Sequence, residues 1–207
     1  MKFFRLYRVH LASAFLLSVL VGAFYIGDLE SGTVEDARDT TTADFMDATH
    51  GKIHYQTFGR TSHEPVVFIH GFSSAFFVWD KNVEPVSRAG FQTIRYDLYG
   101  RGISDRPDLT NDDDLFDRQL LDIVQGLRLR APVNLVGLSM GGRIAVNFAD
   151  RHPGLVRRLA LVDCAGYEMR LPAVAYVMQV PLLGEFLSGA LSTRLILKRL
   201  PENFHEP

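Results

Sequence analysis

The chain has 207 residues, of which 47% are hydrophobic and 22% are charged, and its formal net charge is −2. This is enough chain for one globular domain with its own hydrophobic core. The near-neutral charge argues against nucleic-acid binding, and the single cysteine, Cys164, excludes an internal disulfide framework.

The N-terminal part carries a membrane-targeting pattern. Residues 1–8 form a basic segment, and residues 9–26 contain no Asp, Glu, Lys or Arg, which makes them just long enough for a transmembrane helix. Basic residues before this stretch and acidic residues after it predict a single-pass signal anchor with a cytoplasmic N-terminus and an exported domain. A cleaved signal peptide, giving a secreted protein, is the alternative, because residues 21–23 offer a small-residue cleavage site. The apolar residues 24–26 continue past that site and favour the uncleaved anchor.

Residues 27–43 are rich in Thr, Asp and Gly, which predicts a flexible linker. The core of the domain is expected over residues 44–166, where short apolar runs alternate with stretches of helical spacing. This alternation predicts an α/β fold with a mostly parallel sheet, right-handed crossovers and flanking helices. The expected strands are 45–49, 52–58, 65–69, 92–96, 133–137 and 158–163, and the expected helices are 79–89, 115–129 and 141–151.

The first functional motif follows a buried strand. The apolar run 65–69 is typical of a strand buried on both faces, and it ends in His70, Gly71 and Phe72. In an acyl-transfer site, a loop of this kind supplies a backbone N–H that binds the oxyanion. Gly71 allows the loop to bend, and we expect the donor to be the amide of Phe72.

The second motif is Gly-Leu-Ser-Met-Gly at residues 137–141, between the apolar run 133–136 and a helical pattern. A serine hydroxyl becomes a useful nucleophile when it is exposed above the edge of the sheet and hydrogen-bonded to a base. A sharp strand-to-helix turn provides that exposure. The glycines at both ends of the motif allow that turn. The turn also places Ser139 at a helix N-terminus, where the amide of Met140 is a second oxyanion donor. The motif predicts that Ser139 is the nucleophile of a serine hydrolase.

A third segment, residues 97–104, reads Asp-Leu-Tyr-Gly-Arg-Gly-Ile-Ser. Together with the two motifs above, it makes the chain from about residue 44 onward resemble the N-terminal part of the α/β-hydrolase superfamily, in the serine-nucleophile branch with a lid after the sixth strand. The resemblance implies that Asp97 and Ser104 stabilise their loop rather than react. A serine at position 139 argues against haloalkane dehalogenases and epoxide hydrolases, whose nucleophile is an aspartate. Esterases, lipases, carbon–carbon bond hydrolases, peptidases and cofactor-free haloperoxidases resemble the pattern equally, so it names no substrate.

A hydrolase of this type needs an acid and then a histidine after the serine in the chain. Asp163, at the end of the last expected strand, is the candidate acid, although we favour an ordering role for it in the loop that follows. Neither later histidine suits the role of base, because His152 lies where the expected helix 141–151 ends and His205 lies in a polar tail. His70 is near the site, where the family uses it to shape the oxyanion loop. We therefore expect a chain without its triad histidine, truncated after the sixth strand.

Residues 167–207 differ in character from the core. They carry apolar residues at helical spacing, divided by Pro172 and Pro181. This segment resembles the opening helices of a lid. By analogy, a complete lid would line an apolar substrate site and favour an ester, lipid or ring-derived substrate.

Two hypotheses about function follow from these observations. The first is an exported, membrane-anchored serine hydrolase acting on an ester or related acyl bond of a small apolar substrate, through Ser139 and the amides of Phe72 and Met140. It needs no metal and no organic cofactor, and the acidic cluster 112–114 lacks the pattern of a hard-ligand metal loop. The second is a catalytically incomplete remnant or binding module, since no triad histidine is expected. Its last strand would be an exposed apolar sheet edge, which invites pairing with another chain.

Overall fold

The computed structural model describes residues 34–39 and 44–166, and the structural statements below concern those two ranges. The expected basic segment 1–8, the expected anchor 9–26 and the expected lid 167–207, which contains His205, lie outside the described residues. Among the helices of the described ranges, none is both long and apolar enough to cross a membrane.

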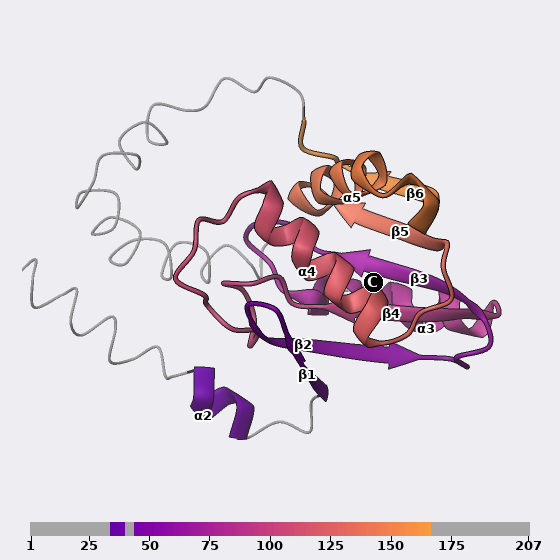
Figure 1. Ribbon diagram of the computed structural model, residues 1–207. Helices are drawn as coiled ribbons and strands as arrows, with labels where there is room; N and C mark the ends of the chain where they lie inside the picture. The colour runs from indigo at the N-terminus through magenta and orange to yellow at the C-terminus, as the bar shows by residue number, and fades with distance from the viewer. Residues whose placement is uncertain (1–33, 40–43, 167–207) are drawn as a thin grey trace, which may run out of the picture. The chain divides into compact units, whose positions relative to one another are not determined.

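A single mixed sheet forms the framework of the described part (Figure 1). Its strands are β1 (Asp44–Ala48), β2 (Gly51–Phe58), β3 (Glu64–Ile69), β4 (Phe91–Tyr96), β5 (Val133–Leu138) and β6 (Val156–Val162). They lie side by side in the order β1-β2-β4-β3-β5-β6. The hairpin β1–β2 joins β4 in antiparallel fashion, whereas β4, β3, β5 and β6 are parallel to one another. The predicted α/β fold with a mostly parallel sheet is confirmed.

Helices cover both faces of this sheet. They are η1 (Phe76–Trp79), α3 (Asp80–Arg88), α4 (Asp113–Gly126), α5 (Met140–Arg151) and η2 (Pro153–Leu155). The side chains of β3 alternate between the two faces, as strand geometry requires. Val67 and Ile69 belong to the core cluster with α4 and α5, whereas Val66 and Phe68 pack with Val83 of α3. Because β3 is buried on both faces, it reads as a continuous apolar run in the sequence.

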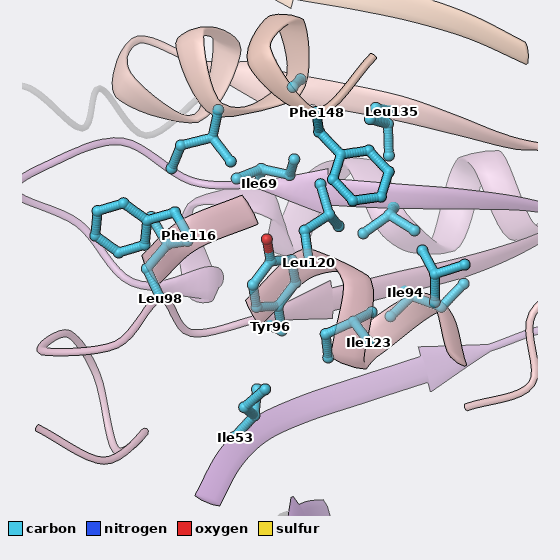
Figure 2. Close-up of a cluster of buried hydrophobic side chains, with 14 of the residues drawn as sticks. Ile53, Ile69, Ile94, Tyr96, Leu98, Phe116, Leu120, Ile123, Leu135 and Phe148 are labelled. Atoms are coloured by element: carbon cyan, nitrogen blue, oxygen red, sulfur yellow. The ribbon is translucent and has the colours of Figure 1, made fainter. Parts of the chain in front are cut away.

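The larger core lies between the sheet and helices α4 and α5 (Figure 2). Ile69 and Ile94 come from adjacent parallel strands, and Leu120, Ile123 and Phe148 cover them from the two helices. All five side chains have 0% exposure, and complete burial of one such side chain contributes about 1.5–3 kcal/mol. This core holds the ends of β3 and β5, from which the two sequence motifs extend.

Helix α4 starts and ends for local reasons. The acidic cluster marks its start, because the carboxylate of Asp112 accepts a hydrogen bond from Leu115 N–H at 3.0 Å and so caps the first turn. The sequence predicts this helix over 115–129, and it runs over 113–126 instead. The chain leaves the helix early because Arg128 adopts φ 49°, and Leu129 then turns back into the core.

A short helix, α2 (Val34–Asp39), lies within the segment predicted to be a flexible linker. The guanidinium of Arg38 holds it to the domain, donating to Ile103 O at 2.7 and 2.8 Å and to the carboxylate of Asp105 at 2.6 Å. Asp105 also accepts from Lys52 N–H at 2.6 Å, at the start of β2. Residues 34–39 therefore form part of the domain surface, which composition alone did not indicate.

Candidate active site

Ser139 occupies the turn between β5 and α5 with φ 51° and ψ −113°. This backbone conformation is unfavourable for a residue with a side chain and costs about 1–3 kcal/mol. The left-handed φ belongs to the serine and not to the flanking glycines, which are needed instead because other backbone atoms approach them closely. A Cβ at Gly137 would clash with the backbone of the first turn of α5, and a Cβ at Gly141 would clash with the carbonyls of Ile69 and His70.

The end of β6 holds this turn in place. Ser139 N–H donates to Val162 O at 2.9 Å, and Ala165 N–H donates to Ser139 O at 3.0 Å. Cys164 packs its thiol against Gly142, where a Cβ would come within 2.8 Å of the sulfur. Three segments therefore fix the backbone of Ser139, namely the end of β5, the start of α5 and residues 162–165.

The loop after β3 lies directly beside Ser139. A Cβ placed on Gly71 would be 3.5 Å from Ser139 Cβ and 3.5 Å from Leu138 O, so the loop makes close contact with the serine turn. Among the described residues, the amide N–H groups of Phe72 and Met140 have no hydrogen-bond acceptor. Two amides without a described acceptor thus lie on the segments next to Ser139, and free amide donors are what an oxyanion-binding site needs.

His70 connects this loop to the next one. Its ring is fully buried, with Nε2 accepting from Leu98 N–H at 3.0 Å and Nδ1 lying 2.7 Å from Gly71 O. Because Nε2 accepts, the proton sits on Nδ1 and is donated to the carbonyl of Gly71. That carbonyl shares a planar peptide unit with Phe72 N–H, so His70 also fixes the direction of the Phe72 amide. Burial is the main cause that lowers the pKa of His70, which keeps the ring neutral.

Asp97 organises the loop after β4. Its carboxylate accepts from Phe76 N–H at 2.8 Å and Ile103 N–H at 3.1 Å, and it lies 2.7 Å from His54 Nδ1. Ser104 donates its hydroxyl to Asp97 O at 2.7 Å and accepts from His54 N–H at 2.9 Å. These contacts occupy both side chains and agree with the expected role of Asp97 and Ser104 in stabilising the loop.

The structure does not bring a described histidine to Ser139. No described side chain forms a hydrogen bond with Ser139 Oγ, and both nitrogens of His70 are already engaged. His152 follows the C-terminus of α5, a 12-residue helix that separates it from Ser139 by roughly 18 Å, and its Nε2 lies 3.0 Å from Asp117 Oδ2. His54 is paired with Asp97.

Asp163 lies directly after β6 with φ 44°, and its side chain is exposed. It makes no hydrogen bond to another described residue, and its neighbours 162 and 165 bind the backbone of Ser139. The described ranges contain no group of His, Cys, Asp or Glu side chains arranged to hold a metal ion.

The sequence gives no indication of the role of one residue in this region, Arg101. The guanidinium of Arg101 donates from Nε to Phe72 O at 3.3 Å and lies 5.0 Å from the centre of the Phe72 ring. No local pattern reveals this contact, because it depends on β3 and β4 being neighbours in the sheet.

Comparisons with known proteins agree with this fold. A family profile for the alpha/beta hydrolase fold matches residues 64–193. A cis-3-alkyl-4-alkyloxetan-2-one decarboxylase of Shewanella oneidensis is 28% identical over 150 residues, which are 69% of this chain and 46% of that protein. Epoxide hydrolase 3 of Xenopus tropicalis is 27% identical over 168 residues, 74% of this chain and 45% of that protein. The solved structure of an esterase from Exiguobacterium antarcticum is also similar to this chain. The two superpose with a TM-score of 0.59 at 25% sequence identity, over 72% of this chain and 59% of the esterase chain.

The chain thus spans less than half the length of the two curated relatives compared. Their names and that of the solved esterase describe three different reactions. The comparisons agree on the fold and differ on the chemistry, so a substrate has to be argued from the site itself.

Proposed function

This chain belongs to the α/β-hydrolase fold family, and on that premise we propose that it is a serine hydrolase acting on an ester or related acyl bond of an apolar substrate. Ser139 is the nucleophile, and the amides of Phe72 and Met140 form the oxyanion hole. The observation that carries the proposal is the close approach of the Gly71 loop to Ser139, with two amides that have no acceptor among the described residues.

In the proposed reaction, Ser139 Oγ attacks the acyl carbonyl carbon and a base takes the hydroxyl proton. The carbonyl oxygen becomes an anion that accepts hydrogen bonds from the two amides, and the alcohol then leaves with a proton returned by the base, so that the acyl group stays bound to Ser139 Oγ. Water, deprotonated by the same base, then attacks this ester, and the acid product leaves as the proton returns to Ser139 Oγ. Phe72 is 67% exposed at this point and offers an apolar surface, which supports an apolar substrate.

The base in this mechanism comes from outside the described residues. His70 is neutral but its Nδ1–H and Nε2 are both used, and His152 is directed to Asp117. Asp163 is the candidate, among the described residues, for the acid that would orient such a base, because it lies within the segment 162–165 that binds the backbone of Ser139. We expect weak reactivity of Ser139 in the 207-residue chain unless a base is supplied.

A fluorophosphonate probe tests the proposal, because it phosphonylates an activated serine. We expect slow labelling of the chain, faster labelling when imidazole is added as a base, and none in Ser139→Ala. The oxyanion hole alone leaves about 10³–10⁴-fold acceleration over water in triad enzymes that lack a catalytic residue. Ser73→Ala is the matched control, since Ser73 is an exposed serine in the neighbouring loop.

Labelling that persists in Ser139→Ala would contradict the nucleophile assignment. Rapid labelling without imidazole would mean that the chain contains its own base, and Asp163 and His205 would be the first pair to mutate. Absence of labelling even with imidazole would favour the second candidate function, a binding module without catalysis. The exposed apolar edge at β6, with Leu161 46% and Val162 41% exposed, is the observation that supports this second candidate.

On sequence grounds alone, we also propose that residues 9–26 anchor the chain in a membrane with the domain exported. Alkaline extraction of membranes from expressing cells tests this, since an anchored chain stays with the lipid and a cleaved, secreted chain does not. Protease added outside intact cells should reach the domain.

A further inference from the structure

Arg101 is a half-buried cation on the loop after β4, and among the described residues it has no carboxylate partner. Its hydrogen bonds go to backbone carbonyls and an amide instead. Nε donates to Phe72 O at 3.3 Å, while Nη1 donates to Tyr99 O at 3.0 Å and to Asn111 Oδ1 at 3.4 Å. A charged group that is partly removed from water needs hydrogen bonds of this kind, so these contacts hold the guanidinium in one position.

Two aromatic rings complete the surroundings of the guanidinium. Its carbon lies 5.0 Å from the centre of the Phe72 ring and 5.6 Å from that of Phe116, within the range of cation–π attraction. Phe116 is part of the core on α4. Arg101 therefore ties the exposed residue Phe72 to the rigid interior through both its carbonyl and its ring.

Phe72 is held from two sides by different residues. His70 binds Gly71 O, which fixes the peptide unit before the Phe72 α-carbon, and Arg101 binds Phe72 O, which fixes the peptide unit after it. With both flanking peptide planes held, the direction of Phe72 N–H beside Ser139 is determined.

We propose that Arg101 is a positioning residue for the oxyanion hole, holding the Phe72 peptide so that its N–H faces the oxyanion formed at Ser139. This rests on the proposed serine hydrolase function. A lysine cannot replace the arginine, because a single ammonium group lacks the planar fork that reaches Phe72 O and Tyr99 O together.

The test uses Arg101→Lys, which keeps the charge and loses the fork, and Asn111→Ala, which removes an exposed partner of Arg101 and leaves the core intact. Arg106→Lys is the matched control, because Arg106 is an exposed arginine of the same loop with one long hydrogen bond to Gly102 O at 3.4 Å. Fluorophosphonate labelling with added imidazole is separated into the probe's binding constant and the rate of reaction of bound probe.

We expect Arg101→Lys to lower the rate of reaction of bound probe by roughly 10- to 100-fold, less than the 10²–10³-fold typical for complete loss of an oxyanion donor. Asn111→Ala should lower it less, Arg106→Lys should not change it, and the binding constant should change little in all three. A destabilised fold would weaken both quantities, so this split distinguishes positioning from a general loss of structure. An unchanged rate in Arg101→Lys would overturn the inference.

A second readout does not depend on activity. Phe72 is exposed, so chymotrypsin can cleave after it, and mass spectrometry measures how fast that peptide bond is lost. We expect faster cleavage in Arg101→Lys than in the parent chain or Arg106→Lys. If the parent chain is not labelled at all, the proposed function fails, and the cleavage rate alone then decides whether Arg101 holds Phe72. An equal cleavage rate would mean that it does not.

Discussion

At the scale of single residues, Ser139 combines two properties that conflict. In the proposed site its hydroxyl acts together with the amides of Phe72 and Met140, but the turn requires φ 51° from a residue that has a side chain. Strain of this kind persists only where the surroundings enforce it. Here the hydrogen bonds of Ser139 to Val162 and Ala165 do so.

We predict that Ser139→Gly raises the free energy of unfolding by about 1–2 kcal/mol, because glycine adopts a positive φ without steric cost. Ser139→Ala keeps the strain and serves as the control, with little expected gain. Urea denaturation followed by circular dichroism measures both. Equal stability of the two variants would show that the turn is not strained at this position.

The buried ring of His70 leads to a second prediction at this scale, on how the stability of the fold depends on pH. Its pKa is lowered, mainly by burial, so the unfolded chain binds a proton that the folded chain does not over a range below the ordinary value of 6.5. The contribution of His70 to stability is therefore complete above that value and is lost as the pH falls. Each such proton gives a slope of at most about 1.4 kcal/mol per pH unit.

We expect His70→Gln to be less stable at neutral pH, because Leu98 N–H and Gly71 O lose their partner. Its stability should also fall less steeply between pH 6.5 and pH 5 than that of the parent chain. Denaturation curves at several pH values measure this slope, and His50→Gln is the control. A variant with the parent slope would contradict the assignment of a neutral, buried ring.

At the scale of elements, the attachment of α2 depends on one carboxylate. Asp105 accepts from Arg38 on α2 and from Lys52 N–H on β2, so it connects two segments that are distant in the chain. Burial by itself would raise the pKa of Asp105, but these hydrogen bonds lower it. The stabilisation is therefore present above its ordinary value of 3.8 and is lost on further acidification.

We predict that Asp105→Ala destabilises the domain by about 1–3 kcal/mol and increases hydrogen exchange in both α2 and the first residues of β2, because charged hydrogen bonds are lost at each. Asp108→Ala is the control, since Asp108 is exposed and makes no hydrogen bond or ion pair with another described residue. Exchange that increases in α2 alone would mean that Arg38, and not Lys52, is the partner that matters.

At the scale of the whole described domain, β6 is the last strand on its side of the sheet, and its apolar side chains are exposed. Leu159, Leu161 and Val162 are 38%, 46% and 41% accessible. An apolar edge strand offers unpaired backbone groups to another chain. The other end of the sheet is formed by the hairpin β1–β2, whose exposed residues are largely polar.

We predict that the purified chain associates with itself as its concentration rises, and that Leu161→Lys reduces this association, because a charge on an edge strand disfavours pairing. Light scattering over a concentration series measures it. Leu109→Lys, on an exposed loop residue with 50% accessibility, is the control. A monomeric, cooperatively melting sample at all concentrations would contradict the role of β6.

How much of this could be predicted from the sequence depends on the range of the interactions. The strands and their parallel arrangement could be predicted, because burial on both faces of β3 and β5 leaves continuous apolar runs in the sequence. The turn at Ser139 could be predicted as well, because residues 137–141 describe a local steric requirement. From the sequence, we expect the glycines at 137 and 141 to allow a sharp turn. The structure shows a different reason for them, since neighbouring backbone atoms leave no room for a side chain and neither glycine has a left-handed φ.

Contacts between distant segments could not be predicted. Three hydrogen bonds join residues that only the sheet order brings together. They link Arg101 to Phe72, His54 to Asp97, and Arg38 of α2 to Asp105. Composition suggested a linker over 27–43 because its residues favour turns, and an ionic contact with Asp105 outweighs that preference. The sequence by itself determined the elements and the sharp turn at Ser139, since local sterics and burial periodicity control them. Only the tertiary structure decided which side chains orient the site, because that depends on the neighbours each strand acquires in the sheet.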